Sequence, residues 1–171
     1  MATSRSFDAD AVDWRILGEL QADARLSFNE LARRVHLSPP AVAERVRRMR
    51  EAGVIAGYRA VVEPAAVGQA VRAFVQLRCR PGACLLRTTG EADYPEVAAI
   101  HRLSGEYCTL LEIRARDLAH FEGVVERIGT HGEVRTHIVL STQYEGRPVT
   151  ALDNERPVTP SAGWSSRGGA E

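Results

Sequence analysis

The chain has 171 residues, of which 44% are hydrophobic and 26% are charged, so it can form one ordinary domain or two small ones around a buried core. Its 22 basic residues, all of them arginine, balance 22 acidic residues, which excludes binding to nucleic acid through total charge and requires any basic surface to be local. The three cysteines form no Cys-x-x-Cys pair, which argues against a zinc site or a disulfide scaffold and favours a reducing compartment.

Nothing in the sequence indicates a membrane segment or an export signal. Residues 1–10 contain no apolar core of a signal peptide, and no apolar run approaches the roughly 18 residues of a spanning helix. We therefore expect a soluble, cytoplasmic protein without a membrane partner.

Two helices are predicted near the N-terminus. Asp10 can cap a helix over residues 11–21, in which apolar residues recur at helical spacing. Ser27 and Glu30 form a Ser-x-x-Glu capping box, which indicates the start of a second, short helix ending near His36.

A third helix follows after a turn formed by residues 36–38. Ser38 is a good N-cap residue, Pro39 fits the first helical position, and Gly53 is well placed to end the helix. Two helices separated by so short a turn have the spacing of a helix-turn-helix. We expect residues 1–53 to form a DNA-binding domain with a helix-turn-helix of the winged type.

The second half of the chain alternates strands and helices. A strand over residues 54–62 and a hinge turn over residues 64–68 form the predicted linker, 54–69. From residue 70 the apolar period changes from about 3.6 residues to about 2. The elements predicted from there are strand 71–78, helix 83–92, strands 97–103 and 109–115, helix 118–129 and strand 134–142. This order is ferredoxin-like (βαββαβ), so we predict an α+β fold with a ferredoxin-like domain over residues 70–145, one sheet face of which is left open to water or a partner.

The last segment of the chain, residues 146–171, is rich in Pro, Gly, Ser and Thr and lacks an apolar period. It contains the sequence Arg-Pro-Val-Thr at 147–150 and again at 156–159. This composition predicts a disordered tail.

The third helix carries a local excess of positive charge. Between Arg33 and Arg50 there are six arginines and one glutamate, a charge of +5 in a neutral chain. On a helical wheel Glu44, Arg47 and Arg48 point away from the apolar stripe, as a helix that enters the major groove requires. A solvated charged face is the competing interpretation. The full set of predicted DNA-binding residues is Ser38, Pro39, Pro40, Glu44, Arg45, Arg47, Arg48, Arg33, Arg34 and Arg50.

Geometry assigns different roles within this set. Ser38 and the N–H groups that follow it can bind a phosphate at the start of the helix. Arg47 and Arg48 can donate to guanine, and Glu44 can accept from cytosine N4. Phosphate contacts, which set the register but carry no sequence information, are expected from Arg33, Arg34, Arg45 and Arg50.

Short motifs in both halves of the chain, taken in order, point to a known family. The first half has Leu-Ser-Pro at the head of the third helix, then Arg-Val-Arg-Arg-Met and Gly-Val-Ile-x-Gly-Tyr. The second half has Tyr-Pro-Glu-Val, then Ser-Gly-Glu-Tyr, and ends with Val-Arg-Thr-His-Ile-Val-Leu-Ser-Thr. Over about residues 8–145 the chain resembles the Lrp/AsnC family of leucine-responsive, or feast/famine, transcription regulators.

The resemblance implies a sequence-specific DNA-binding regulator with no enzymatic activity, cofactor or metal. Family members pair through their open sheet faces and often assemble four dimers into an octamer. We therefore expect a homodimer, and from it an octamer, on pseudo-palindromic double-stranded DNA in the nucleoid. Many members bind an amino acid between dimers, near the Ser-Gly turn. Carried over to this sequence, the effector-binding residues are Leu103, Ser104, Gly105, Glu106, Tyr107, Cys108 and Thr136.

Two positions depart from the family pattern. His36 stands where the family has glycine, and we expect the turn to survive because histidine tolerates a left-handed conformation at some cost. Cys108 stands where the family has aspartate, and a thiol cannot supply the charge that would hold a ligand's ammonium group. A weakly bound effector, an effector other than an amino acid, and no effector all stay open. Cys108 itself fits either a buried inert thiol or a redox sensor.

Two other functions compete with this prediction. Siroheme decarboxylases share the two-domain plan and would use His101, Arg102 and His137, but the chain lacks that group's Pro-Tyr and His-Asn-Tyr motifs. An architectural DNA-binding protein without an effector is the second alternative, and Cys108 favours it.

Overall fold

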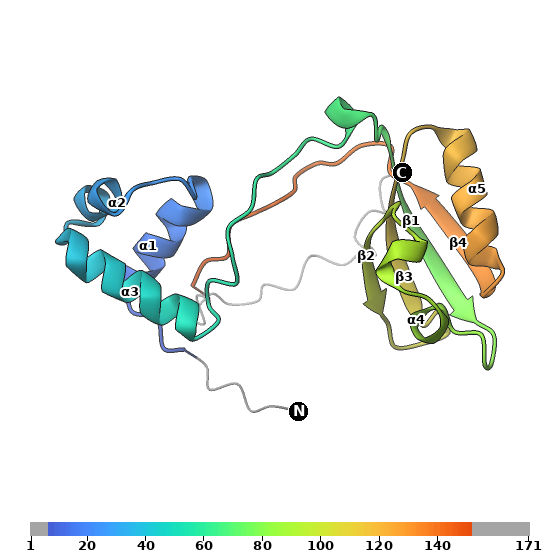
Figure 1. The fold of residues 1–171 in the computed structure, drawn as a ribbon, viewed down its shortest axis with the longest axis horizontal. Helices are drawn as coiled ribbons and strands as arrows, with labels where there is room; N and C mark the ends of the chain where they lie inside the picture. Colours follow the sequence, from blue (N-terminus) through green and yellow to red (C-terminus); the bar gives the residue numbers. More distant parts are fainter. Residues whose placement is uncertain (1–6, 152–171) are drawn as a thin grey trace, which may run out of the picture. The chain divides into compact units, whose positions relative to one another are not determined.

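A computed structural model of the chain describes residues 7–151, which fall into two compact units (Figure 1). The first unit contains the residues up to Arg59 together with the segment that begins at Gly146, and the second runs from Ala60 to Glu145. Each unit has its own hydrophobic core. Because the cores are separate, a substitution in one unit can change its stability without changing that of the other.

Three helices make up most of the first unit. They are α1 (Ala11–Ala22), α2 (Phe28–Val35) and α3 (Pro39–Glu51), with bounds close to those predicted. Their apolar side chains recur at helical spacing and meet in one core. The buried residues of this core are Ile16, Leu17, Leu31, Ala32, Val35, Val42, Val46 and Met49.

Polar side chains start each of these helices. The Asp10 carboxylate accepts hydrogen bonds from two N–H groups in the first turn of α1. Ser27 and Glu30 form the predicted capping box at the start of α2. Ser38 Oγ accepts a bond of 3.4 Å from the first turn of α3. These caps satisfy N–H groups that have no partner inside the helix, and so they fix where each helix begins.

The turn between α2 and α3 depends on His36. Its backbone is left-handed, with φ 57° and ψ 47°, and among the described residues it is the only residue other than glycine with a positive φ. The N–H groups of His36 and Leu37 both bond to the carbonyl of Ala32, which closes the end of α2. The prediction that histidine can support this turn is confirmed.

The second unit is an antiparallel sheet with the strand order β2-β3-β1-β4. Its strands are β1 (Val71–Cys79), β2 (Val97–Arg102), β3 (Thr109–Ala115) and β4 (Gly132–Ile138). Its helical segments are the 3₁₀ turn η1 (Ala65–Val67), α4 (Leu85–Thr88), the 3₁₀ turn η2 (Glu91–Asp93) and α5 (Leu118–Gly129). This is the predicted ferredoxin-like order, and the predicted α+β fold class is confirmed.

The two faces of the sheet have different surroundings. One face packs against α5 and against Leu85 and Tyr94, and its buried core consists of Ala73, Val75, Leu77, Leu85, Tyr94, Leu111, Ile113, Ala115, Phe121, Val124 and Ile128. Among the described residues, α4 and α5 both contribute to this face. The other face, called the open face below, carries the alternate side chains of β1, β3 and β4, among them Arg72, Phe74, Gln76, Leu110, Glu112, Arg114, Arg135 and His137.

Gly132 marks a very close approach between β4 and β1, which the sequence analysis did not single out. It lies opposite Cys79, and a Cβ added at this position would overlap the backbone carbonyl of Arg78. Glycine is therefore required here by space rather than by its backbone angles.

One predicted strand is absent from the described residues. Residues 54–62 pair with no neighbouring strand, and the N–H groups of Val54 and Ile55 instead bond to the carbonyl of Met49 at the end of α3. A strand needs a second backbone to satisfy its N–H and C=O groups, and the linker has none here. The prediction of a strand over residues 54–62 is therefore wrong.

Two other elements are shorter than predicted. The helix predicted over 83–92 is divided into α4 and η2, because the hydroxyls of Thr88 and Thr89 bond back to backbone carbonyls at 3.1 and 2.7 Å. Such side-chain bonds compete with continuation of a helix. The last strand ends at Ile138 instead of residue 142, with one more bond from Val139 N–H to β1.

The segment after the sheet lies with the first unit. The side-chain amide of Gln21 in α1 accepts a bond of 2.7 Å from Val149 N–H and donates one of 2.9 Å to its carbonyl. This two-bond contact, called the Gln21–Val149 clasp below, joins α1 to a residue of the predicted tail. The rest of that tail, residues 152–171, lies outside the described residues.

Candidate DNA-binding surface and effector loop

The side of α3 that faces away from its core carries most of the predicted DNA-binding residues. Val42, Val46 and Met49 are buried, so the side chains between them point outward. The exposed members of the predicted set are Ser38, Pro39, Pro40, Glu44, Arg47, Arg48 and Arg50 on or before α3, and Arg33 and Arg34 at the end of α2.

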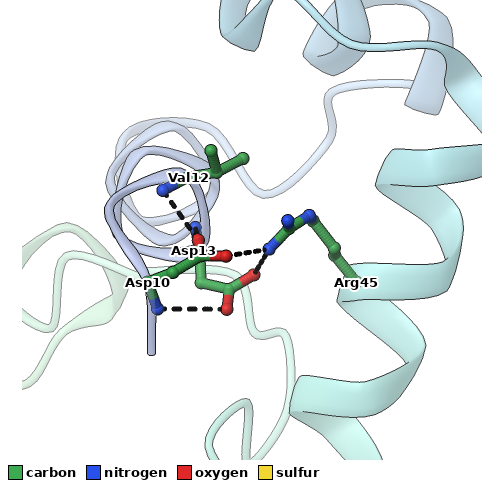
Figure 2. Close-up of polar contacts among 4 residues, drawn as sticks. All are labelled: Asp10, Val12, Asp13 and Arg45. Atoms are coloured by element: carbon green, nitrogen blue, oxygen red, sulfur yellow. Dashed lines mark hydrogen bonds and ion pairs between the residues drawn. The ribbon is translucent and has the colours of Figure 1, made fainter. Parts of the chain in front are cut away.

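Arg45 is the exception, because it reaches back to α1. Its Nη1 lies 2.7 Å from Asp10 Oδ2 and 2.7 Å from Asp13 Oδ1 (Figure 2). Asp13 is 1% exposed and Arg45 is 25% exposed, so the ion pair is partly shielded and joins two helices. Bonds from the Asp13 N–H and from Arg45 lower the pKa of Asp10 and keep it ionised. The geometry gives Arg45 a packing role, and the phosphate contact predicted for it stays a prediction.

Arg47 is bonded to acidic residues on its own helix. Its guanidinium lies 2.6 Å from Glu44 and 2.7 Å from Glu51. The bond from Arg47 lowers the pKa of Glu44, which is therefore ionised at neutral pH. Two of the three residues predicted to read bases, Glu44 and Arg47, are thus bonded to each other.

The remaining arginines divide into two groups. Arg34 pairs with Glu19 at 2.7 Å, and the Arg48 guanidinium lies 5.5 Å from the centre of the Phe7 ring. Arg33 and Arg50 have no ion-pair partner among the described residues. These last two can therefore meet a phosphate without breaking an existing ion pair.

The predicted effector residues 103–108 form the turn between β2 and β3. The Leu103 N–H donates to the Cys108 carbonyl at 2.8 Å, which closes the turn. Gly105 has φ 105°, a backbone angle that other residues rarely adopt. The turn is thereby held in one shape at the end of the sheet.

Side chains from β1 and β4 surround Tyr107 and form a group called the Tyr107 cluster below. The Tyr107 hydroxyl donates to Glu133 at 2.9 Å, and the Arg135 guanidinium lies 4.7 Å from the ring centre. Arg78 pairs with Glu106 at 2.8 Å and also with Glu133. The sequence analysis missed Arg78, Glu133 and Arg135, although charged residues at alternate positions of one strand indicate a shared face.

Protonation states in the Tyr107 cluster follow from these contacts. Burial raises the pKa of the Tyr107 phenol, and its bond to Glu133 adds to the effect. The Tyr107 hydroxyl and the charge of Arg78 lower the pKa of Glu133. At neutral pH the phenol is therefore a donor and the carboxylate is charged.

Thr136, the other predicted effector residue, lies on the opposite face of the sheet. It is paired with Val75, which points into the core beneath α5, and side chains of paired residues share a face. Arg135, one position earlier, points to the open face with Tyr107. The structure therefore does not bring Thr136 to the turn.

The second unit also contains a cavity of about 460 Å³ between α4 and β2. Leu85, Tyr94, Val97 and Ile100 are among its lining residues, and none of residues 103–108 lines it. The cavity is therefore distinct from the turn. Within the described residues, no group of His, Cys, Asp and Glu is arranged to hold a metal ion, and no helix is long and apolar enough to cross a membrane.

The two units together define a class of protein, a helix-turn-helix DNA-binding domain joined to a ferredoxin-like domain. Family models match each unit: the AsnC-type helix-turn-helix domain matches residues 10–50, and the Lrp/AsnC ligand binding domain matches residues 72–149. The chain belongs to the Lrp/AsnC family of transcription regulators, with a DNA-binding and a ligand-binding domain.

Its curated relatives are named as regulators. The HTH-type transcriptional regulator Rv2324 of Mycobacterium tuberculosis is 38% identical over 144 residues, covering 81% of this chain and 97% of the relative. The proline dehydrogenase transcriptional activator of Rhodobacter capsulatus is 35% identical, covering 85% and 94%. Because the relatives regulate transcription, the siroheme decarboxylase alternative is set aside and the chain is not an enzyme.

Solved structures agree with this assignment. The feast or famine regulatory protein Rv3291c of Mycobacterium tuberculosis, complexed with L-methionine, superposes with a TM-score of 0.75 at 33% identity, covering 84% of this chain and all of that one. Bacillus subtilis LrpC superposes with a TM-score of 0.74 at 29% identity, covering 80% and 97%.

Proposed function

We propose that this regulator reads a pseudo-palindromic operator in double-stranded DNA through the exposed side of α3. The observation that carries the proposal is that α3 begins at a capped N-terminus after the His36 turn and buries only its apolar stripe. Glu44, Arg47 and Arg48 then face outward together, and Ser38 is exposed at the start of the helix.

A salt-dependent titration against the DNA upstream of the chain's own gene tests this proposal, with random DNA as competitor. We expect preference for the operator and an affinity that falls steeply with salt, because cations on α2 and α3 displace counterions from phosphates. Equal affinity for operator and random DNA would contradict sequence-specific reading.

The regulator assembles, in this proposal, as a homodimer through the open face and then as an octamer. Phe74 lies half-buried among charged side chains there, and Arg72 stacks over its ring at 5.6 Å. A second copy of the sheet would remove this apolar surface from water. Sedimentation velocity measures the mass directly, and a monomer at micromolar concentration would overturn the proposal. Operators bound by a dimer have two half-sites about one helical turn apart, or a multiple of it.

An amino acid is the proposed effector, bound at the Tyr107 cluster between dimers. A zwitterion needs an acceptor for its ammonium group and a donor for its carboxylate. Glu106 and Glu133 offer acceptors there, whereas Arg78 and Arg135 offer donors, so the missing aspartate at Cys108 does not leave the cluster without negative charge. The methionine complex of the relative Rv3291c supports an effector of this class.

Thermal-shift measurements with single amino acids test the effector. A ligand at 100 times its dissociation constant adds about 2.7 kcal/mol to the stability of the native state, enough to raise the melting temperature measurably. Glu133→Gln should weaken the shift, and Arg33→Ala, in the other unit, should leave it unchanged. If no amino acid shifts the melting temperature, the architectural alternative without an effector is favoured.

The compartment follows from the partner. A regulator of this family acts where the chromosome lies, so we propose a cytoplasmic, nucleoid-associated location. Fluorescence microscopy of a tagged chain should show a signal that overlaps stained DNA, and a signal excluded from the DNA would contradict this location.

A further inference from the structure

Two carboxylates on α3 hold the guanidinium of Arg47. Its Nε and Nη2 donate to the two oxygens of Glu44 at 3.0 and 2.6 Å, and its Nη1 donates to Glu51 at 2.7 Å. The three side chains, called the Arg47 triad below, are all more than half exposed. An isolated exposed ion pair holds its geometry weakly, whereas a forked pair within a network of charges is better fixed. The triad therefore presents Arg47 in a defined orientation on the outer side of α3.

The Arg47 triad leaves donors and acceptors free for a ligand. A guanidinium has five N–H groups, and the three bonds use one each on Nε, Nη1 and Nη2. The two donors that remain are on Nη1 and Nη2, the terminal nitrogens of the fork. An ionised carboxylate can accept about four bonds, and Glu44 accepts two from Arg47, so it keeps an acceptor beside those donors. A ligand that offers two acceptors next to one donor fits these free groups without breaking a bond of the triad.

The charge of the Arg47 triad argues against a phosphate as its target. One guanidinium and two carboxylates carry one positive and two negative charges, a sum of −1, which repels a phosphate. Arg33 and Arg50 have no ion-pair partner among the described residues, so they offer positive charge without that opposition. The edge of a base pair is bound through matched donors and acceptors instead, and it carries the sequence information.

One kind of base pair offers the matching pattern. In the major groove, guanine presents two acceptors, N7 and O6, and its paired cytosine presents a donor, N4. An adenine·thymine pair places its donor between two acceptors instead. Guanine O6 and cytosine N4 are bonded to each other at about 2.9 Å. The bonds of 2.6 and 3.0 Å between Arg47 and Glu44 are similar in length, so the two side chains can lie next to each other along the edge of one guanine·cytosine pair.

We infer that Glu44 and Arg47 read one guanine·cytosine pair in each half-site as a unit, with Glu51 as the residue that positions Arg47. Arg47 donates to guanine N7 and O6, and Glu44 accepts from cytosine N4. Glu51 touches no base, but its bond holds Nη1 and its charge opposes an approach of Arg47 to phosphate. The inference rests on the proposed function, because α3 must enter the major groove of an operator, and it adds the base pair that this operator must contain.

Titration against operators in which each base pair is changed in turn tests the reading of a guanine·cytosine pair. At the position where Arg47→Ala relaxes specificity, the wild-type chain should prefer guanine·cytosine over adenine·thymine by about tenfold to a hundredfold. Replacing that guanine by 7-deazaguanine, which lacks the N7 acceptor, should weaken binding by the wild-type chain but not by Arg47→Ala. Glu44→Ala should relax specificity at the same position. A preference for adenine·thymine there, or relaxation by Glu44→Ala at another position, would overturn the inference.

Glu51→Ala tests the positioning of Arg47, because it leaves Arg47 and Glu44 without net charge and allows Arg47 to meet a phosphate. The affinity for random DNA should rise, and the slope of log affinity against log salt concentration should steepen by about 1. The ratio of operator affinity to random-DNA affinity should fall severalfold.

Glu19→Ala is the matched control for Glu51→Ala, since it removes a carboxylate of the same unit and frees Arg34 for DNA of any sequence. It should leave the affinity ratio unchanged, and equal melting curves check that both variants fold. An unchanged ratio in Glu51→Ala would overturn the positioning role of Glu51. Equal affinity of the wild-type chain for operator and random DNA would instead contradict the proposed function, and the inference with it.

Discussion

Ion pairs in the two units have different surroundings, and this difference separates structural charges from exchangeable ones. In the first unit, Arg45 pairs with the buried Asp13 between α1 and α3. In the second unit, Arg78 pairs with Glu106 and Glu133, and all three side chains are about half exposed. Removing one partner of a shielded pair leaves a buried charge, whereas an exposed pair exchanges with water or a ligand at little cost. The pair in the first unit therefore holds α3 against α1, whereas the charges of the network in the second unit can exchange partners.

The largest effect is expected from Gly132→Ala, which should destabilise the second unit and leave the stability of the first unchanged. A methyl group at this position overlaps backbone atoms of Arg78, so the strands must move apart. Overpacking of this kind costs about 1–3 kcal/mol, and more where backbone must shift. Calorimetry should show a lower melting temperature for the sheet.

Gly123→Ala in α5 is the matched control, because a Cβ there meets nothing within 4 Å. It should stabilise α5 slightly, since alanine favours a helix over glycine by about 0.5–1 kcal/mol. An equal loss of stability in both variants would contradict the close approach at Gly132.

Asp13→Ala tests whether the shielded ion pair between Arg45 and Asp13 stabilises the first unit. It removes the buried partner of Arg45, and hydrogen bonds to charged groups contribute about 1.5–3 kcal/mol. Denaturant unfolding followed by helical signal should show a loss in that range. Glu19→Ala is the control, because it removes an exposed ion pair with Arg34 and should change the free energy of unfolding little. An equal loss of stability in both variants would contradict the distinction between shielded and exposed pairs.

Arg47→Ala tests whether the exposed charges of α3 read sequence. We expect the operator affinity to fall about tenfold to a hundredfold and specificity to relax at one base pair. Arg33→Ala should instead weaken binding to all DNA sequences alike. It should also reduce the slope of log affinity against log salt concentration by about 1. Titration of both proteins against operators that differ by single base pairs separates these outcomes. If Arg47→Ala weakens binding to all of these operators equally, Arg47 contacts a phosphate instead of a base.

The smallest effect is expected from acid, through Glu133. Its pKa is held below the ordinary value of 4.5, so the folded state favours the charged form. The resulting stability is present above that value and is lost as pH falls through the folded pKa. Thermal melts between about pH 6 and pH 3 should show the sheet losing stability on acidification, and Glu133→Gln should reduce that slope. An unchanged slope would place the acid sensitivity elsewhere.

The sequence was sufficient to predict a feature of the fold where that feature depends on residues close to it along the chain. The capping box at Ser27 and the Ser38-Pro39 start of α3 are local signals, and both are present as predicted. The succession of strands and helices along the second half of the chain followed from the period at which apolar residues recur. Even the left-handed His36 was predictable, because its position in the turn decides its backbone.

Prediction failed where a residue depends on a distant partner. A helical wheel placed Arg45 at the flank of α3, but it could not show that the Asp13 carboxylate of α1 lies within reach. The strand predicted over 54–62 had the right residues and no partner backbone. Gly132 and the Tyr107 cluster depend on the register between β1 and β4, which alternation alone does not fix.

The Gln21–Val149 clasp also has a consequence for the order in which the chain folds. Its two bonds are exposed, and they join residues 128 positions apart, so they close a long loop with little energy of their own. Closing such a loop is entropically unfavourable until the intervening chain is compact. The clasp therefore forms last on folding and opens first on unfolding, and the Val149 amide should exchange its hydrogen with solvent well before the amides of either core.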